Sequence, residues 1–173
     1  PRAMMGRPFD PSRERWPTAL RALLAEMNRR FVRLNEQAHW MGLDILVFPQ
    51  GTRSVRLSRG HIGLAELVLH LGATLVPVGC SGCDLVYPGR SMRSKPGTVT
   101  YRIGEPMYPD DFADVAPREP FEPFTPEAEN RHREAFQEVV DRVMERIDGL
   151  VDERHRYTAD LESDGTTGTD RFV

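Results

Sequence analysis

The stretch "DILVFPQGTRS" at residues 44–54 joins an apolar run directly to a polar loop. The run at 44–48 predicts a short strand of the kind that is buried on both faces in a parallel sheet. In the loop, Gly51 lets backbone amides approach a ligand closely, and the guanidinium of Arg53 matches phosphate or carboxylate oxygens. The loop therefore suits a small anionic group at the carboxyl end of a strand. A tight turn with a surface arginine fits the same residues equally well.

The segments around this stretch predict an α/β fold. Apolar residues recur every three or four positions in 17–38, in 60–71 and after the pair Thr125-Pro126, which predicts three helices. Short apolar or alternating runs at 73–78 and 98–103 predict two further strands. A strand, helix, strand order with short connections indicates a crossover, so we expect a mostly parallel or mixed central sheet flanked by helices.

Length and composition predict one domain. We expect an irregular segment at 1–11, one α/β domain at 12–154 and a disordered tail at 155–173 of the 173-residue chain. The formal net charge is −3, whereas a general nucleic-acid binder usually carries a basic excess, so we expect no nucleic-acid partner. No apolar run approaches the roughly 18 residues that suggest a membrane-spanning helix. Because the first residue is Pro1, we expect the chain to be processed or part of a longer protein.

Four ordered features carry a resemblance to a known family. FPQGTRS at 48–54 looks like the FPEGTRS block of the 1-acyl-glycerol-3-phosphate acyltransferases, and Arg59-Gly60 opens the next helix as in that family. The run GATLVPV at 72–78 and the Ile-Gly-Glu-Pro sequence at 103–106 resemble two further family segments, and a helix rich in Met, Ile and Leu closes the region. The resemblance covers roughly residues 18–151.

The resemblance implies a function in phospholipid synthesis. A fatty acyl group would pass from acyl-CoA or acyl carrier protein to a hydroxyl of lysophosphatidate or a related glycerol phosphate, with no other cofactor and no metal. The acceptor would be bound by the residues of the block, which are Gln50, Gly51, Thr52, Arg53 and Ser54, with Arg53 at the phosphate. It also implies a place at the cytoplasmic face of a membrane, with membrane contact through upstream segments.

Two departures from the family pattern matter for the chemistry. Position 50 is glutamine where the family usually has glutamate, which leaves the acceptor's identity open. The family's catalytic His-x-x-x-x-Asp block should lie several tens of residues before FPEGTRS. His39 and Asp44 match its spacing, but five strand residues span about 16 Å, which places His39 too far from Arg53. We therefore expect the catalytic pair to lie upstream of this sequence, and this chain alone to be inactive.

Two alternatives to a catalytic acyltransferase stay open. The chain could be a non-catalytic module, related to the enzymes, that keeps the anion pocket and lacks the chemistry. It could also be an unrelated phosphate-binding α/β protein, such as a sugar-phosphate enzyme. An intact His-x-x-x-x-Asp block upstream of Phe48 would favour the enzyme over the first alternative.

The two cysteines form a Cys-x-x-Cys sequence, Cys80 to Cys83. Redox or metal chemistry would need a suitable helix start or a second pair of ligands, and the sequence contains no other cysteine. We expect ordinary loop cysteines in a reducing compartment.

Overall fold

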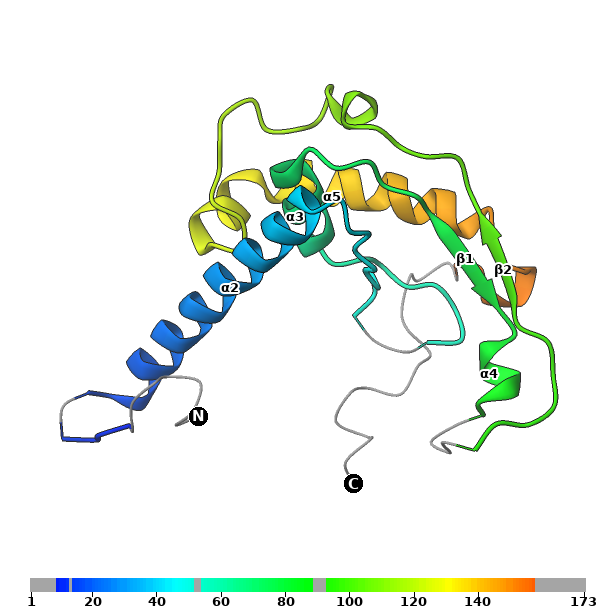
Figure 1. The fold of residues 1–173 in the computed structure, drawn as a ribbon, viewed down its shortest axis with the longest axis horizontal. Coiled ribbons are helices and arrows are strands. Elements are labelled where there is room, and N and C mark those ends of the chain that lie inside the picture. The colour runs from blue at the N-terminus through cyan, green and yellow to red at the C-terminus, as the bar shows by residue number, and fades with distance from the viewer. Residues whose placement is uncertain (1–8, 13, 52–53, 89–92, 158–173) are drawn as a thin grey trace.

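The computed structural model describes residues 9–12, 14–51, 54–88 and 93–157. Its elements, in chain order, are α2 (Trp16–Trp40), α3 (Gly63–Leu71), β1 (Val78–Ser81), α4 (Cys83–Val86), β2 (Thr100–Ile103), η1 (Pro109–Phe112), α5 (Pro126–Asp148) and η2 (Glu153–His155). They form an arch in which α2 is one limb, β1, β2 and α4 are the other, and α3 and α5 lie between them (Figure 1).

Helix α2 confirms the helix expected over 17–38. It begins with a proline in its first turn, where the missing N–H costs nothing. Its apolar stripe is largely exposed, and Ala19 is its only buried residue. The stripe residues Leu20, Leu24, Met27, Phe31 and Leu34 are 39–65% exposed. Near Phe124, the helix gains a ring contact from Phe31 and a hydrogen bond from Asn28.

The hydrophobic core lies where α3 packs against α5. Gly72 ends α3 in the left-handed conformation. Helix α5 begins at the predicted Thr125-Pro126 pair, where the Thr125 hydroxyl accepts the Ala128 N–H at 3.3 Å. Gly60, in the chain just before α3, packs directly against α5, where a methyl group on it would lie 2.5 Å from a Val140 carbon. The buried apolar residues of α5 are Ala128, Phe136, Val139, Val140, Val143 and Met144.

The sheet has two antiparallel strands in the described part of the chain. Val78 pairs with Ile103, and Ser81 pairs with Thr100. Strand β1 begins at the end of the run expected to be a strand, 73–78. Pro77 explains this shift, because it has no N–H to donate to a ladder and separates β1 from an isolated bridge at Leu75.

The strand expected at 44–48 does not form in the described residues. Leu46 and Phe48 are 80% and 74% exposed, and no described segment pairs with this run. A strand is defined by its hydrogen-bonded neighbour, so an apolar run without a neighbour remains extended chain. The crossover expected between 44–48 and 73–78 is therefore not formed here, and a larger parallel or mixed sheet stays a prediction.

Two segments of the second half are more ordered than expected. Cys80 and Cys83, expected to be loop cysteines, lie in β1 and at the start of the short helix α4. The folded part extends to Tyr157, three residues past the expected domain boundary at 154, because His155 is buried and Tyr157 packs on the core. The rest of the expected tail, 158–173, lies outside the described residues.

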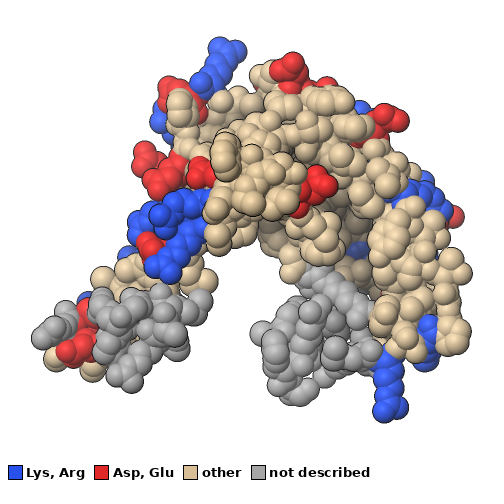
Figure 2. Space-filling model, in the orientation of Figure 1, with Lys and Arg blue, Asp and Glu red and all other residues tan. Residues whose placement is uncertain are grey.

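Charged side chains are distributed over the outer surface. Figure 2 shows lysines and arginines interspersed with aspartates and glutamates over the arch. No helix in the described ranges combines the length and the apolar character needed to cross a bilayer.

Candidate functional site

The FPQGTRS block forms a tight turn at Gly51. The Gly51 N–H donates to the Phe48 carbonyl at 3.0 Å, and Gly51 has a φ of +64°. This left-handed conformation is one that glycine adopts without steric cost. The structure thus gives a local reason for the glycine that the sequence singled out. Thr52 and Arg53, the expected hydroxyl and phosphate ligands, lie outside the described residues, and Ser54 is half-buried.

Gln50 hydrogen-bonds to the segment that follows the block. Its side-chain amide donates to the Ser58 hydroxyl at 3.0 Å and to the Arg56 carbonyl at 3.3 Å. A glutamate at this position could not donate to the Arg56 carbonyl. The glutamine therefore braces the loop in this chain, a role that the sequence analysis did not anticipate.

His61 packs against the first residues of the block. Its backbone N–H donates to the Pro49 carbonyl at 2.8 Å, which brings positions 49 and 61 together. Its ring lies beside Gly51, where an added methyl group would come 3.0 Å from a ring carbon. An imidazole thus lies against the turn of the block.

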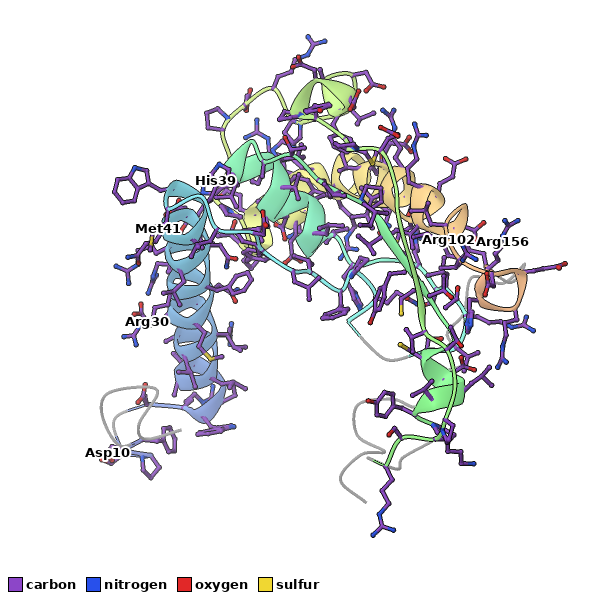
Figure 3. All side chains as sticks on the ribbon, turned by 45° about the vertical axis from the view of Figure 1, so that its right-hand side comes forward. Asp10, Arg30, His39, Met41, Arg102 and Arg156 are labelled. Carbon is purple, nitrogen blue, oxygen red and sulfur yellow. The ribbon has the colours of Figure 1, made fainter. Side chains whose placement is uncertain are left out.

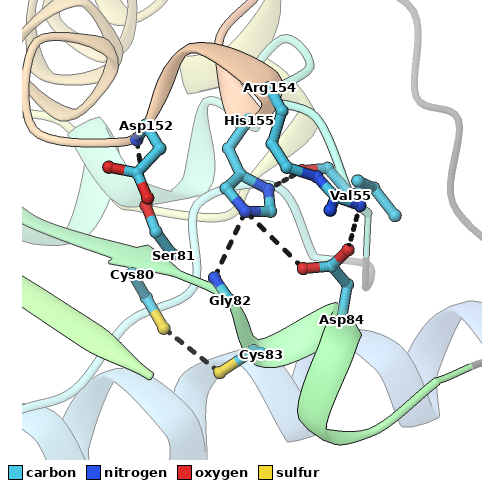
Figure 4. A network of polar contacts seen from close by, with 9 residues as sticks. All are labelled: Val55, Cys80, Ser81, Gly82, Cys83, Asp84, Asp152, Arg154 and His155. Atoms are coloured by element: carbon cyan, nitrogen blue, oxygen red, sulfur yellow. Dashed lines mark hydrogen bonds and ion pairs between the residues drawn. The ribbon is translucent and has the colours of Figure 1, made fainter. Parts of the chain in front are cut away.

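A histidine from the chain after α5 holds the segment that directly follows the block (Figure 4). His155 is buried, and its Nδ1 lies 2.6 Å from the Val55 carbonyl. The Gly82 N–H donates to its Nε2 at 3.2 Å, which requires Nε2 to accept and Nδ1 to carry the proton. The His155 carbonyl also accepts the Leu57 N–H at 2.9 Å. His155 therefore connects the segment just after the block, the turn after β1 and the chain after α5.

Asp84 completes this network beside His155. One of its carboxylate oxygens is paired with Arg154, and the other lies 3.5 Å from Nε2 of His155. That second oxygen is buried and has no hydrogen-bond partner within the described part of the chain. No sequence signal pointed to this group, because its members come from residues up to 100 positions apart.

His39 and Asp44 do not form a site in the structure. His39 lies near the C-terminal end of α2 (Figure 3), and both His39 and Asp44 are exposed. Among the described contacts, neither side chain is hydrogen-bonded to the other or to the block. The expectation that His39 and Asp44 are not the catalytic pair stays a prediction.

A cleft of about 1290 Å³ lies away from the block. It runs between α2 and the connector 120–126, and its lining includes the buried faces of Asn28 and Phe124 but none of residues 48–51. Its lining carries charges of both signs: three arginines, Arg21, Arg29 and Arg33, and four glutamates, Glu26, Glu36, Glu122 and Glu129. The cleft therefore carries no charge pattern that selects an anionic ligand.

Comparison with known proteins gives one distant relative. The chain is 29% identical over 98 residues to a 1-acyl-sn-glycerol-3-phosphate acyltransferase of Cocos nucifera, a region that is 56% of this chain and 30% of that enzyme. The chain thus aligns with about a third of that relative's length. No protein-family model matches the chain, and no solved structure matches it. The similarity favours the acyltransferase family and an acyltransferase function in general terms, without specifying the donor or acceptor.

Proposed function

We propose that this chain is the acceptor-binding part of a glycerolipid acyltransferase. The reaction moves a fatty acyl group from acyl-CoA or acyl carrier protein to a hydroxyl of lysophosphatidate or a related glycerol phosphate in phospholipid synthesis. The distant similarity to an enzyme of that name supports the reaction class. The observation that carries the proposal is the left-handed turn at Gly51. Hydrogen bonds from the Gly51 N–H to the Phe48 carbonyl and from the His61 N–H to the Pro49 carbonyl hold this turn.

The contacts of the described residues around the block support its role as an anion site. Pro49 accepts the His61 N–H, His155 contacts the Val55 carbonyl just after the block, and Gln50 is bonded to Ser58. Residues that are held in place before binding lose less conformational entropy when a ligand arrives. In this proposal Arg53 pairs with the acceptor phosphate, and Gly51, Thr52 and Ser54 form the remainder of the pocket with Gln50 behind them.

The general base of the reaction is proposed to come from residues outside this sequence. The acceptor hydroxyl must lose a proton as it attacks the thioester carbonyl, which a histidine paired with an aspartate can accept. His39 and Asp44 are exposed and separate in the structure, so they are not proposed for this step. We also propose that the enzyme works at the cytoplasmic face of a membrane, since its acceptor is a lipid.

Ligand binding by the chain itself tests the phosphate site. Glycerol 3-phosphate should bind with measurable heat in titration calorimetry, and glycerol should not. Arg53→Ala should weaken this binding about 10- to 100-fold, because a charge-assisted hydrogen bond contributes about 1.5–3 kcal/mol. Arg33→Ala on the exposed surface of α2 is the matched control and should bind normally.

Three outcomes separate the proposal from its alternatives. Equal binding of glycerol and glycerol 3-phosphate, or no effect of Arg53→Ala, would remove the block from phosphate recognition. Tighter binding of sugar phosphates than of glycerol 3-phosphate would favour an unrelated phosphate-binding protein. If the longer protein binds lysophosphatidate but releases no thiol from acyl-CoA, the module is non-catalytic.

A further inference from the structure

The two cysteine sulfurs lie side by side where β1 joins α4 (Figure 4). Cys80 lies in β1 and Cys83 is the first residue of α4, and their Sγ atoms are 3.2 Å apart. The turn between them depends on Gly82, which has a φ of +86°. A methyl group on Gly82 would lie 2.3 Å from the Thr98 carbonyl oxygen, so this backbone path needs glycine. The fold therefore holds the two thiols together through a constrained turn.

Neither metal binding nor core packing accounts for this pair. A structural zinc site needs four ligands, and no group of three or more potential ligands occurs within the described ranges. Both cysteines are half-buried free thiols, and neither belongs to the buried apolar core of α3 and α5. Both residues are partly exposed. Two sulfurs 3.2 Å apart are arranged for bond formation, because only a modest side-chain adjustment would bring them to the ~2 Å of a disulfide.

We propose that Cys80 and Cys83 are a redox modification site that forms a reversible disulfide by exchange with a small-molecule disulfide of the glutathione type. In the first step a thiolate attacks one sulfur of oxidised glutathione, forms a mixed disulfide and releases one glutathione thiolate. In the second step the other protein thiolate attacks the protein sulfur of that mixed disulfide and releases the second glutathione. The protein loses two protons and two electrons, and the reagent gains both.

Burial, with the neighbouring Cys83, raises the pKa of the Cys80 thiol to about 11, so little of it is thiolate at neutral pH. Either cysteine can make the first attack, and the other then resolves the mixed disulfide. The bridged turn contains the Gly82 amide that donates to His155, so the modification site adjoins the network that holds the block. The proposal does not depend on the acyltransferase function.

The test is equilibration of the whole chain with mixtures of reduced and oxidised glutathione, followed by acid quenching, alkylation and mass spectrometry. The folded protein should lose two hydrogen atoms, leave neither cysteine open to alkylation, and return to two thiols with dithiothreitol. Bridge formation should be favoured about tenfold or more over the urea-unfolded chain, because the fold holds the sulfurs together. Cys80→Ser and Cys83→Ser should each stop at a glutathione adduct on the remaining cysteine.

Two results would overturn the proposal. The first is a folded protein that keeps both cysteines alkylatable, or carries only glutathione adducts, under conditions where the unfolded chain forms the bridge. The second is an equal tendency to form the bridge in the folded and unfolded chains, which would mean that the juxtaposition of the sulfurs contributes nothing.

Discussion

Replacing Glu66 by glutamine should remove a pH dependence from the stability of this protein. Glu66 lies in α3 and is 1% exposed, and its carboxylate accepts the Phe124 N–H at 3.1 Å. Burial raises the pKa of Glu66 to about 7, because the charged form loses its hydration. Phe124 has a φ of +60°, an uncommon conformation for a residue with a side chain, and this hydrogen bond helps to hold it.

The size of the effect follows from the two pKa values. In the unfolded chain Glu66 has its ordinary pKa of 4.5, and in the folded protein the pKa is about 7. At 1.36 kcal/mol per pH unit, the difference corresponds to about 3 kcal/mol. Because the folded pKa of this acid is the higher one, the folded state favours the neutral carboxyl. The stabilisation is complete below about pH 4.5 and is lost as the pH rises to about 7.

Urea unfolding followed by circular dichroism measures this loss. The free energy of unfolding of the wild-type protein, compared with that of Glu66→Gln, should fall by up to about 3 kcal/mol between about pH 4.5 and about pH 8. The glutamine keeps an oxygen that accepts the Phe124 N–H but cannot ionise. The control is Glu134→Gln on the exposed face of α5, which should show no such trend. A difference between wild type and Glu66→Gln that is constant with pH would refute the reasoning.

The remaining predictions concern the block and its packing. Gly60→Ala should destabilise the protein by about 1–3 kcal/mol in urea unfolding, because its methyl group would meet Val140 at 2.5 Å. Gly149→Ala is the control, since its methyl group meets only ordinary contacts at 3.5 Å or more; equal urea midpoints for the two variants would contradict the packing argument. Gln50→Glu should cost about 1–2 kcal/mol, because a carboxylate cannot donate to the Arg56 carbonyl. An unchanged urea midpoint would show that this bond does not brace the loop.

Local signals in the sequence predicted the two long helices. The apolar periodicity of α2 and α5 and the Thr125-Pro126 start of α5 are contained in neighbouring residues, and the structure confirms them. Such elements depend on backbone geometry over a few turns, so a single sequence is sufficient to find them.

Non-local structure could not be predicted in the same way. The run at 44–48 has the composition of a strand, but strand formation depends on a neighbour that is elsewhere in the chain. The start of β1 at Val78 is determined by its pairing with β2. His155 was expected to begin a tail, and its contact with Val55 crosses 100 positions that carry no common pattern. The turn of the candidate site was thus predictable, and the residues that hold it were not.

The hydrogen bonds of His155 mean that the conformation next to the block depends on a residue far away in the sequence. A graft of residues 48–61 alone onto another scaffold would lack the imidazole that bonds the Val55 carbonyl. It would also lack the His155 carbonyl that accepts the Leu57 N–H. A graft that keeps this conformation would have to include the turn after α5. Substitutions in that turn, although remote in sequence, should change ligand binding at the block.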